Sequence, residues 1–278
     1  MQEIIDVKEI QAILLDALRY FKEICEKNNL KFFLSNGTLI GAVKYNQFVP
    51  WDDDVDVLMP REDYDKLLSL TNIDNGKYKL ISNKTTPSWC STYAKLSDTT
   101  TVLEEIGFDL GLEIGISIDI FPIDKWSCCK TRAKIQAFYC DFLKRLLILA
   151  NAESFATEKT GIKRIILKSM YSVSKAIGTK KLQKIIIKKA VKSKKYKDKY
   201  VGCVIWTCHS TTEVLPKEVF EKEEYATFCG DTYPIPIGYN QYLSNLYGNW
   251  EQELPLEKQK SNHKIKAWWK NDKKQNCT

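Results

Sequence analysis

The sequence has no apolar run long enough to cross a bilayer, and its first residues lack the basic and then apolar order of a secretion signal. We therefore expect a cytoplasmic protein with no membrane span. Histidine is scarce, with two residues in 278, and no internal repeat or low-complexity linker marks a domain boundary. Composition by itself describes an ordinary folded chain, with 44% hydrophobic residues.

A disulfide scaffold and a structural zinc site are both disfavoured by the cysteines. There are nine, an odd number, in a chain too long to need covalent staples. Cys203, Cys208 and His209 match no common zinc spacing, and His263 is the only other histidine. We expect reduced, partly buried thiols.

Positive charge is concentrated in one segment. The chain has a net charge of +7, but residues 159–199 hold 15 Lys or Arg against one acid. Within this segment, residues 162–191 place apolar residues beside lysines at helical spacing. This pattern is typical of helices that lie on an anionic membrane surface, and equally of core-packed helices with a solvated lysine face. Peripheral contact with the inner face of the plasma membrane therefore stays open as an expectation.

The apolar periodicity predicts an α+β fold. Residues 30–125 should form a mixed sheet of about four to six strands flanked by helices. Helices are expected at residues 4–28, 39–44, 63–70 and 239–247, and strands at 32–34, 55–58, 78–82, 91–96, 101–106 and 116–121. Residues 131–200 should add a lysine-rich helical subdomain broken at Gly161 and Gly178. We predict three parts: a catalytic core at 1–127, a basic helical insertion at 128–200, and a C-terminal segment at 201–278 that completes the active site.

A dense group of acids follows Trp51, at positions 52–54 and 56. Carboxylates this close repel one another unless something compensates them. In a strand, Asp54 and Asp56 share one face while Val55 and Val57 point into the core. Two carboxylates on one face suit Mg²⁺, which completes its coordination with water and substrate phosphates. The alternative is a solvated acidic turn.

Asp119 is the second unusual acid, because it lies between Ile118 and Ile120 in an apolar strand. A buried unpaired charge is costly, and a shared cation with Asp54 and Asp56 would remove that cost. A salt bridge to Arg or Lys is the alternative. We expect Pro122 to end this strand and Asp124 to be a turn residue or a helix cap.

These segments, taken in order, resemble the LicD family, which includes the fukutin-related transferases and belongs to the nucleotidyltransferase-fold superfamily. The resemblance rests on Ser35–Lys44, Phe48–Val57, Met59–Tyr64, Lys95–Thr100 and Ile118–Asp124, and later on Tyr242–Leu243, Tyr247–Trp250, Leu254–Pro255 and His263. It is most specific over residues 34–64. It implies a nucleotidyltransferase-like fold.

In function, the resemblance implies transfer of a phospho-alcohol from a CDP-linked donor to a hydroxyl of a glycan or lipid-linked glycan precursor, with release of CMP. Phosphocholine is the first candidate for the cargo, followed by ribitol phosphate and glycerol phosphate. The acceptor would belong to a teichoic acid, a capsular polysaccharide or a lipopolysaccharide.

The resemblance also assigns roles to residues. Asp54, Asp56 and Asp119 would bind Mg²⁺ or Mn²⁺ and act in catalysis, and His263 would be a catalytic proton shuttle. The residues expected to contact substrate, from their chemistry and position, are Gly37, Thr38, Lys44, Trp51, Asp53, Arg61 and Lys95. A structural role is an equal alternative for Arg61 and Lys95. Packing in the core or at the rim is the alternative for Trp51, and a structural role is the alternative for His263. Two departures stand out: Lys44 replaces an arginine of many members, and Asn249 replaces a common aspartate.

Three other functions are compatible with parts of this sequence. Nucleotidyl transfer from an NTP would use the same aspartate pair, so that only the resemblance argues against it. A nucleic-acid-binding protein would explain the sequence pI of 8.8 but not the buried carboxylates. A catalytically inactive scaffold would have no need of all three carboxylates. We expect no nucleic-acid partner.

Overall fold

The chain folds into helices and strands in the mixture expected of the α+β class. The structure is a computed structural model that describes residues 2–4, 6–193, 197, 199–261 and 264–270. The helices are α1 (Val7–Lys27), α2 (Asn36–Ile40), α3 (Arg61–Leu67), α4 (Lys130–Asn151), α5 (Gly161–Ile177), α6 (Thr179–Ser193) and α7 (Tyr239–Tyr247). The strands are β1 (Gln2–Ile4), β2 (Phe33–Leu34), β3 (Asp56–Pro60), β4 (Tyr78–Ile81), β5 (Ala94–Asp98), β6 (Thr101–Glu105), β7 (Ser117–Lys125), β8 (Tyr200–Gly202), β9 (Leu215–Pro216), β10 (Glu223–Phe228), β11 (Asp231–Pro236) and β12 (Ile265–Trp269).

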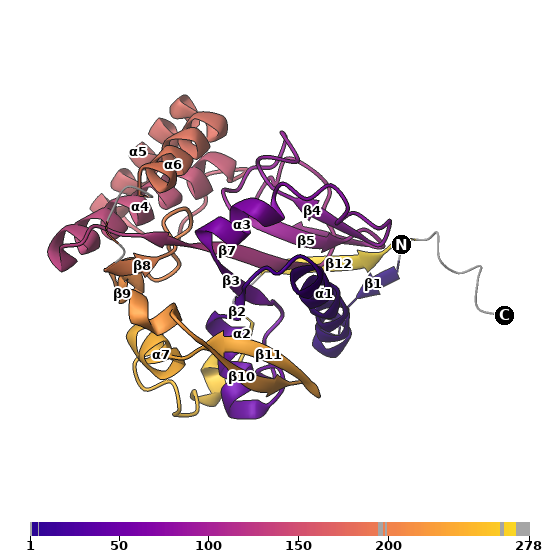
Figure 1. The fold of residues 1–278 in the computed structure, drawn as a ribbon. Coiled ribbons are helices and arrows are strands. Elements are labelled where there is room, and N and C mark those ends of the chain that lie inside the picture. The colour runs from indigo at the N-terminus through magenta and orange to yellow at the C-terminus, as the bar shows by residue number, and fades with distance from the viewer. Residues whose placement is uncertain (1, 5, 194–196, 198, 262–263, 271–278) are drawn as a thin grey trace.

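The main sheet runs in the order β2-β3-β7-β5-β4, and β8 and β9 extend it beside the end of β7 (Figure 1). Strands β3 and β7 are parallel, whereas β5 pairs with β7 in the antiparallel sense. This mixture confirms the predicted sheet. Its register places Asp56 opposite Asp119, and Asp119 opposite Lys95, on three neighbouring strands.

The two faces of the sheet differ in chemistry. Val57, Ile118 and Ile120 are fully buried on one face, and α1 and α3 contact the central strands. Alternation along each strand sends the neighbouring residues Asp56 and Asp119 to the opposite face. The predicted burial of Val55 and Val57 is confirmed.

Strand β7 is longer than expected, and the prediction that Pro122 ends it is wrong. Pairing of β7 with β5 stops at Ile120, and its pairing with β8 starts at Asp124. Pro122 falls between these two ladders, where a missing backbone N–H is tolerated. Asp124 is therefore a buried strand residue, and the expectation of a turn residue or helix cap was also wrong.

The predicted strand at residues 101–106 forms β6 but joins a different sheet. It pairs with β12, which in turn pairs with β1, so that the two ends of the chain meet in one three-stranded sheet. Pairing between positions this distant is set by tertiary packing and leaves no local signal in the sequence.

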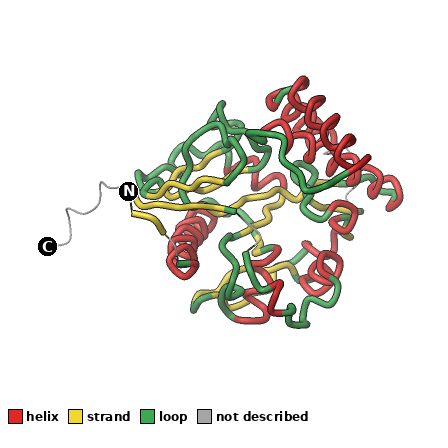
Figure 2. Tube along the Cα trace, turned by 180° about the vertical axis from the view of Figure 1, so that it is seen from behind, coloured by secondary structure: helices red, strands yellow, loops and turns green. Residues whose placement is uncertain are grey.

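The lysine-rich helices α4, α5 and α6 gather at one end of the molecule (Figure 2). Glycines break them where expected, since Gly161 opens α5 and Gly178 separates α5 from α6 with φ of +81°. Within the described ranges, no helix combines the length and the apolar character that a membrane span requires. The described cysteines are free thiols, as expected.

Candidate active site

A row of charged side chains crosses three strands of the main sheet. Asp56 of β3, Asp119 of β7 and Lys95 of β5 are register partners, so their side chains leave the same face. The Lys95 ammonium lies 2.5 Å from Oδ1 of Asp119. Of the two alternatives for Asp119, the salt bridge is thus present in the structure.

Asp56 is held by polar groups from distant parts of the chain. Asn36 Nδ2 donates to Asp56 Oδ2 at 2.9 Å, and the Tyr242 hydroxyl donates to Asn36 Oδ1 at 2.8 Å. The backbone N–H of Asp56 donates to Thr38 Oγ1 at 2.9 Å. Asn36, at the start of α2, and Tyr242, on α7, therefore orient this carboxylate.

The cluster is electrostatically strained at Asp56. Burial raises the pKa of Asp56 well above its ordinary value, and the carboxylates of Asp54 and Asp119 raise it further. Burial lowers the pKa of Lys95, but the neighbouring carboxylates of Asp119 and Glu105 outweigh it, and that pKa is raised overall. Lys95 stays charged, and Asp56 needs additional positive charge in order to ionise.

Two cavities meet at these carboxylates. Each has a volume of about 440 Å³, and both are lined by Asp54, Asp56 and Cys208. We call them the Trp51 cavity and the Lys95 cavity after a residue that lines each. A molecule in either cavity would contact the same pair of aspartates.

The Trp51 cavity is aromatic and basic. Among the residues that line it are Gly37, Lys44, Tyr45, Trp51, His209, Tyr247, Asn249, Trp250, Lys258 and Lys260. Lys44 Nζ lies 3.0 Å from Glu253 Oε1 at the rim. A Cβ atom at Gly37 would lie 2.4 Å from Asp52 Oδ2, so a side chain there would displace this carboxylate.

The Lys95 cavity is more acidic. It is lined by Asp53, Tyr93, Lys95, Glu105, Phe108, Asp119, Trp206 and Lys264, among others. Asp53 accepts a hydrogen bond of 2.6 Å from the Ser261 hydroxyl. Lys264 and Ile265, at the start of β12, also line this cavity, so the last described strand helps to close it.

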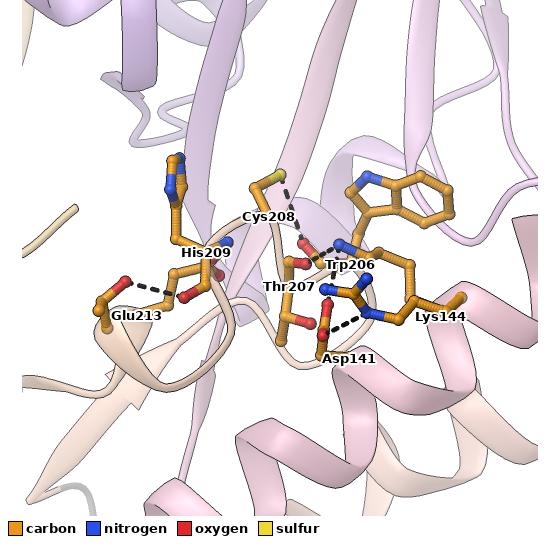
Figure 3. A network of polar contacts seen from close by, with 9 residues as sticks. Asp141, Lys144, Trp206, Thr207, Cys208, His209 and Glu213 are labelled. Atoms are coloured by element: carbon orange, nitrogen blue, oxygen red, sulfur yellow. Dashed lines mark hydrogen bonds and ion pairs between the residues drawn. The ribbon is translucent and has the colours of Figure 1, made fainter. Parts of the chain in front are cut away.

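Sequence reasoning missed the loop at residues 206–209, which lies between the cavities. The backbone of this loop is fixed by side chains: Lys144 of α4 donates to the Thr207 carbonyl, and Glu213 accepts from the His209 backbone N–H (Figure 3). The His209 ring packs edge-on against Tyr247 at 4.9 Å. Burial lowers the pKa of His209, as does the Lys144 charge, so the ring is neutral near pH 7. The sequence suggests a role for His209 only as a zinc ligand, because its distance along the chain from the acids gives no local signal of their proximity.

Three predicted site residues are placed elsewhere or not at all. Arg61 forms a forked pair with Asp124, at 2.7 and 2.8 Å, and lines neither cavity. Thr38 is buried, with its hydroxyl used on the Asp56 backbone. His263 lies outside the described residues. Gly37, Lys44, Trp51, Asp53 and Lys95 line the cavities together with the three predicted metal ligands.

The carboxylates fit a divalent cation in their chemistry. Within the described ranges, no three His, Cys, Asp or Glu side chains are grouped as a ready-made metal site. Mg²⁺ is commonly held by one or two carboxylates with substrate phosphates completing the shell, and Asp54 and Asp56 satisfy that smaller requirement. Burial and the neighbouring carboxylates raise the pKa of Asp56, so a cation beside it would favour its ionised form.

Comparisons with known proteins identify a family domain in this chain and one relative along nearly its whole length. Residues 29–139, which contain Asp54, Asp56, Asp119 and Lys95, match the family model for the LicD/FKTN/FKRP nucleotidyltransferase domain. The lipopolysaccharide cholinephosphotransferase LicD of Haemophilus influenzae is 26% identical over 94% of this chain and 97% of its own length. Uncharacterized proteins of Rickettsia prowazekii and Rickettsia typhi are 44% identical over 41 residues, 15% of this chain. The chain therefore contains a domain that matches the LicD/FKTN/FKRP family model, and it is similar to a LicD protein along nearly its whole length.

Proposed function

We propose that this protein transfers phosphocholine from a CDP-linked donor to a hydroxyl of a cell-surface glycan precursor and releases CMP. The observation that carries the proposal is the meeting of two cavities at Asp54 and Asp56, since a transferase must bring two substrates to one point. The similarity over nearly the whole chain to a cholinephosphotransferase supports the choice of cargo.

The donor is assigned to the Trp51 cavity. Trp51, Tyr247 and Trp250 offer aromatic faces on which cytosine can stack and against which a choline ammonium can rest. Lys44, Lys258 and Lys260 offer positive charge for the pyrophosphate. The same cavity includes both aspartates, so the pyrophosphate would lie beside them.

The acceptor is assigned to the Lys95 cavity. Asp53, Glu105 and Asp119 are carboxylates that can accept hydrogen bonds from sugar hydroxyls, and Trp206 offers a flat face for a sugar ring. The attacking hydroxyl would enter in line with the bond to CMP and give its proton to Asp53 or Asp119. Lys95 would orient Asp119 for this step through their salt bridge.

Asp54 and Asp56 would hold Mg²⁺ or Mn²⁺, with Asp119 beside them. The bound cation would offset negative charge on the pyrophosphate and on the departing CMP. The chain supplies the rest by positioning: Asn36 and Tyr242 orient Asp56, and Lys44 binds phosphate oxygens. Positioning and electrostatics account for most catalysis in phosphoryl transfer.

The proposal is tested by the melting temperature of the protein with CDP-choline, CDP-ribitol, CDP-glycerol and CTP, each with Mg²⁺ or with a chelator. We expect metal-dependent stabilisation by CDP-choline above the others, because only a ligand bound to the folded state raises the melting temperature. Stabilisation by CTP alone would indicate nucleotidyl transfer instead, and no response to any nucleotide would contradict the proposal.

Two variants that each remove one lysine test whether the donor binds in the Trp51 cavity. Lys44→Gln should weaken the CDP-choline effect about tenfold in apparent affinity, since it removes one phosphate contact. Lys66→Gln removes an exposed lysine of α3 that lines neither cavity and should leave the affinity unchanged.

A further inference from the structure

Helix α5 is strongly amphipathic, and most of its residues are exposed. Ser174 is its only buried residue within the described chain. Ile162, Ile165, Ile166 and Val173 have between 52% and 73% of their surface exposed. Their spacing puts them on one side of the helix, so the structure leaves an apolar stripe of large aliphatic side chains facing outward.

The neighbouring helix α4 repeats this arrangement. Ile135, Phe138, Tyr139 and Phe142 are exposed and recur at helical spacing, with Phe138 at 66%. Lys189 of α6 lies over the Tyr139 ring, 4.6 Å from its centroid. A lysine of the basic segment therefore borders the apolar stripe of α4 directly.

The charged residues of α5 and α6 are all basic. Lys163, Arg164 and Lys168 of α5 are exposed, and residues 159–197 contain no acid at all. The helices gather at one end of the molecule, away from the β10–β11 hairpin (Figure 1). An exposed apolar patch bordered by lysines is complementary to a surface that is negatively charged outside and apolar just beneath.

We propose that the outer stripes of α4 and α5 bind the surface of an anionic lipid bilayer, with their apolar side chains inserted at the headgroup level. Lysines and Arg164 at the border would contact lipid phosphates, each adding to the attraction while the ionic strength is low. A second copy of the chain fits this face less well, because it would bring two like-charged segments together.

The proposed membrane-binding surface, formed by the exposed apolar side chains of α4 and α5, is connected to the active site through α4. Lys144 of this helix donates to the Thr207 carbonyl and lies 3.1 Å from Asp141 Oδ1. Figure 3 shows the loop that Lys144 fixes. Residues of this loop line both cavities. Docking would therefore hold the cavities at a defined orientation to the membrane, where an acceptor carried on lipid would be presented.

The test is flotation of the full chain with vesicles, without any substrate, so that its outcome is independent of the proposed transferase activity. We expect binding to phosphatidylcholine vesicles that contain phosphatidylglycerol, and little binding to pure phosphatidylcholine. The triple change Ile162→Gln, Ile165→Gln and Ile166→Gln should lower the partition coefficient about tenfold or more, since it removes the apolar stripe of α5. A second triple change, Lys163→Gln, Arg164→Gln and Lys168→Gln, should weaken binding by a similar factor and reduce its salt dependence.

Leu256→Gln is the matched control, because Leu256 is 83% exposed on a different part of the surface and should keep full binding. Circular dichroism of each variant verifies the helices. Equal binding of the wild type and both triple variants would overturn the proposal. So would equal binding to neutral and anionic vesicles, or a wild-type dimer in solution that the isoleucine variant abolishes.

Discussion

At the scale of single residues, Asp56 is an acid whose environment opposes its charge. It is buried beside Asp54 and Asp119, and its pKa is raised by that burial and by the two carboxylates. We predict that Asp56→Asn lowers kcat about a thousandfold, because a ligand for the catalytic cation is lost. In the absence of divalent cations the variant should unfold at a higher urea concentration than the wild type, since repulsion is relieved.

The control for Asp56→Asn is Asp16→Asn, which neutralises an exposed carboxylate of α1. Its effect on the free energy of unfolding should stay within about 0.5 kcal/mol. A destabilised Asp56→Asn protein in the absence of metal would show that the Asp56 carboxylate stabilises the fold and is not a source of repulsion.

Arg61 gives the second prediction at this scale, because its forked pair with the buried Asp124 argues for a structural role. Arg61→Met should cost about 3 kcal/mol of unfolding free energy, since it leaves Asp124 buried without its partner. Arg61→Lys should cost about 1 kcal/mol, because a lysine cannot form the fork. Urea unfolding measures both.

Enzyme kinetics separate this role from phosphate binding. If Arg61 only supports the fold, Arg61→Lys should leave KM for the donor unchanged. A KM for the donor raised tenfold or more, in a variant of near-native stability, would instead support the phosphate contact that the sequence predicts for Arg61.

At the scale of elements, the loop before β9 depends on a buried acid. Burial raises the pKa of Glu213 from 4.5 to about 8, against the opposing backbone hydrogen bond from His209. The folded protein thus keeps this proton up to about pH 8, whereas the unfolded chain releases it near pH 4.5. The free energy of unfolding should therefore fall as pH rises through this window, by an amount on the order of 3–5 kcal/mol, and level off above it.

Urea unfolding from pH 5 to pH 9 tests this loop prediction. In Glu213→Gln the side chain cannot ionise, so the slope of stability against pH should be clearly smaller than in the wild type. Identical slopes for the two proteins would mean that Glu213 is ionised in the fold at neutral pH.

At the scale of the whole molecule, the two chain ends are joined through β1, β12 and β6, and the start of β12 lines the Lys95 cavity. A chain that ends at Ser261 should lose about 3 kcal/mol of unfolding free energy, because the strand that covers β6 is removed. It should also lose transfer to the acceptor more severely than stabilisation by CDP-choline, since the Trp51 cavity uses no residue of β12.

A chain that ends at Lys270 is the control for this truncation, because it retains all of β12. Chemical denaturation and the nucleotide melting assay compare the two. Full transferase activity in the shorter chain would show that the acceptor does not bind in the Lys95 cavity.

Local patterns were sufficient for many elements of the fold. Apolar spacing located α1, and strict alternation located the strand that carries Asp119, because helix and strand periods are read directly from neighbouring residues. The acids of the Asp54–Asp56 segment and the order of the motifs indicated both the family and the position of the site. The predicted division into three parts stays a prediction.

Tertiary structure alone decided which partners these residues have. Lys95 faces Asp119 because β5 lies beside β7, Arg61 turns to Asp124 because α3 packs on β7, and β12 closes a cavity by crossing to β6. None of these pairings joins near neighbours in the chain. The sequence by itself determined which reactive side chains are present and which local helices and strands form, since these follow from residue types and from neighbouring positions. Long-range packing decides which side chains meet, and it places His209 beside the carboxylates. This packing depends on contacts throughout the fold, so it cannot be read from neighbouring residues.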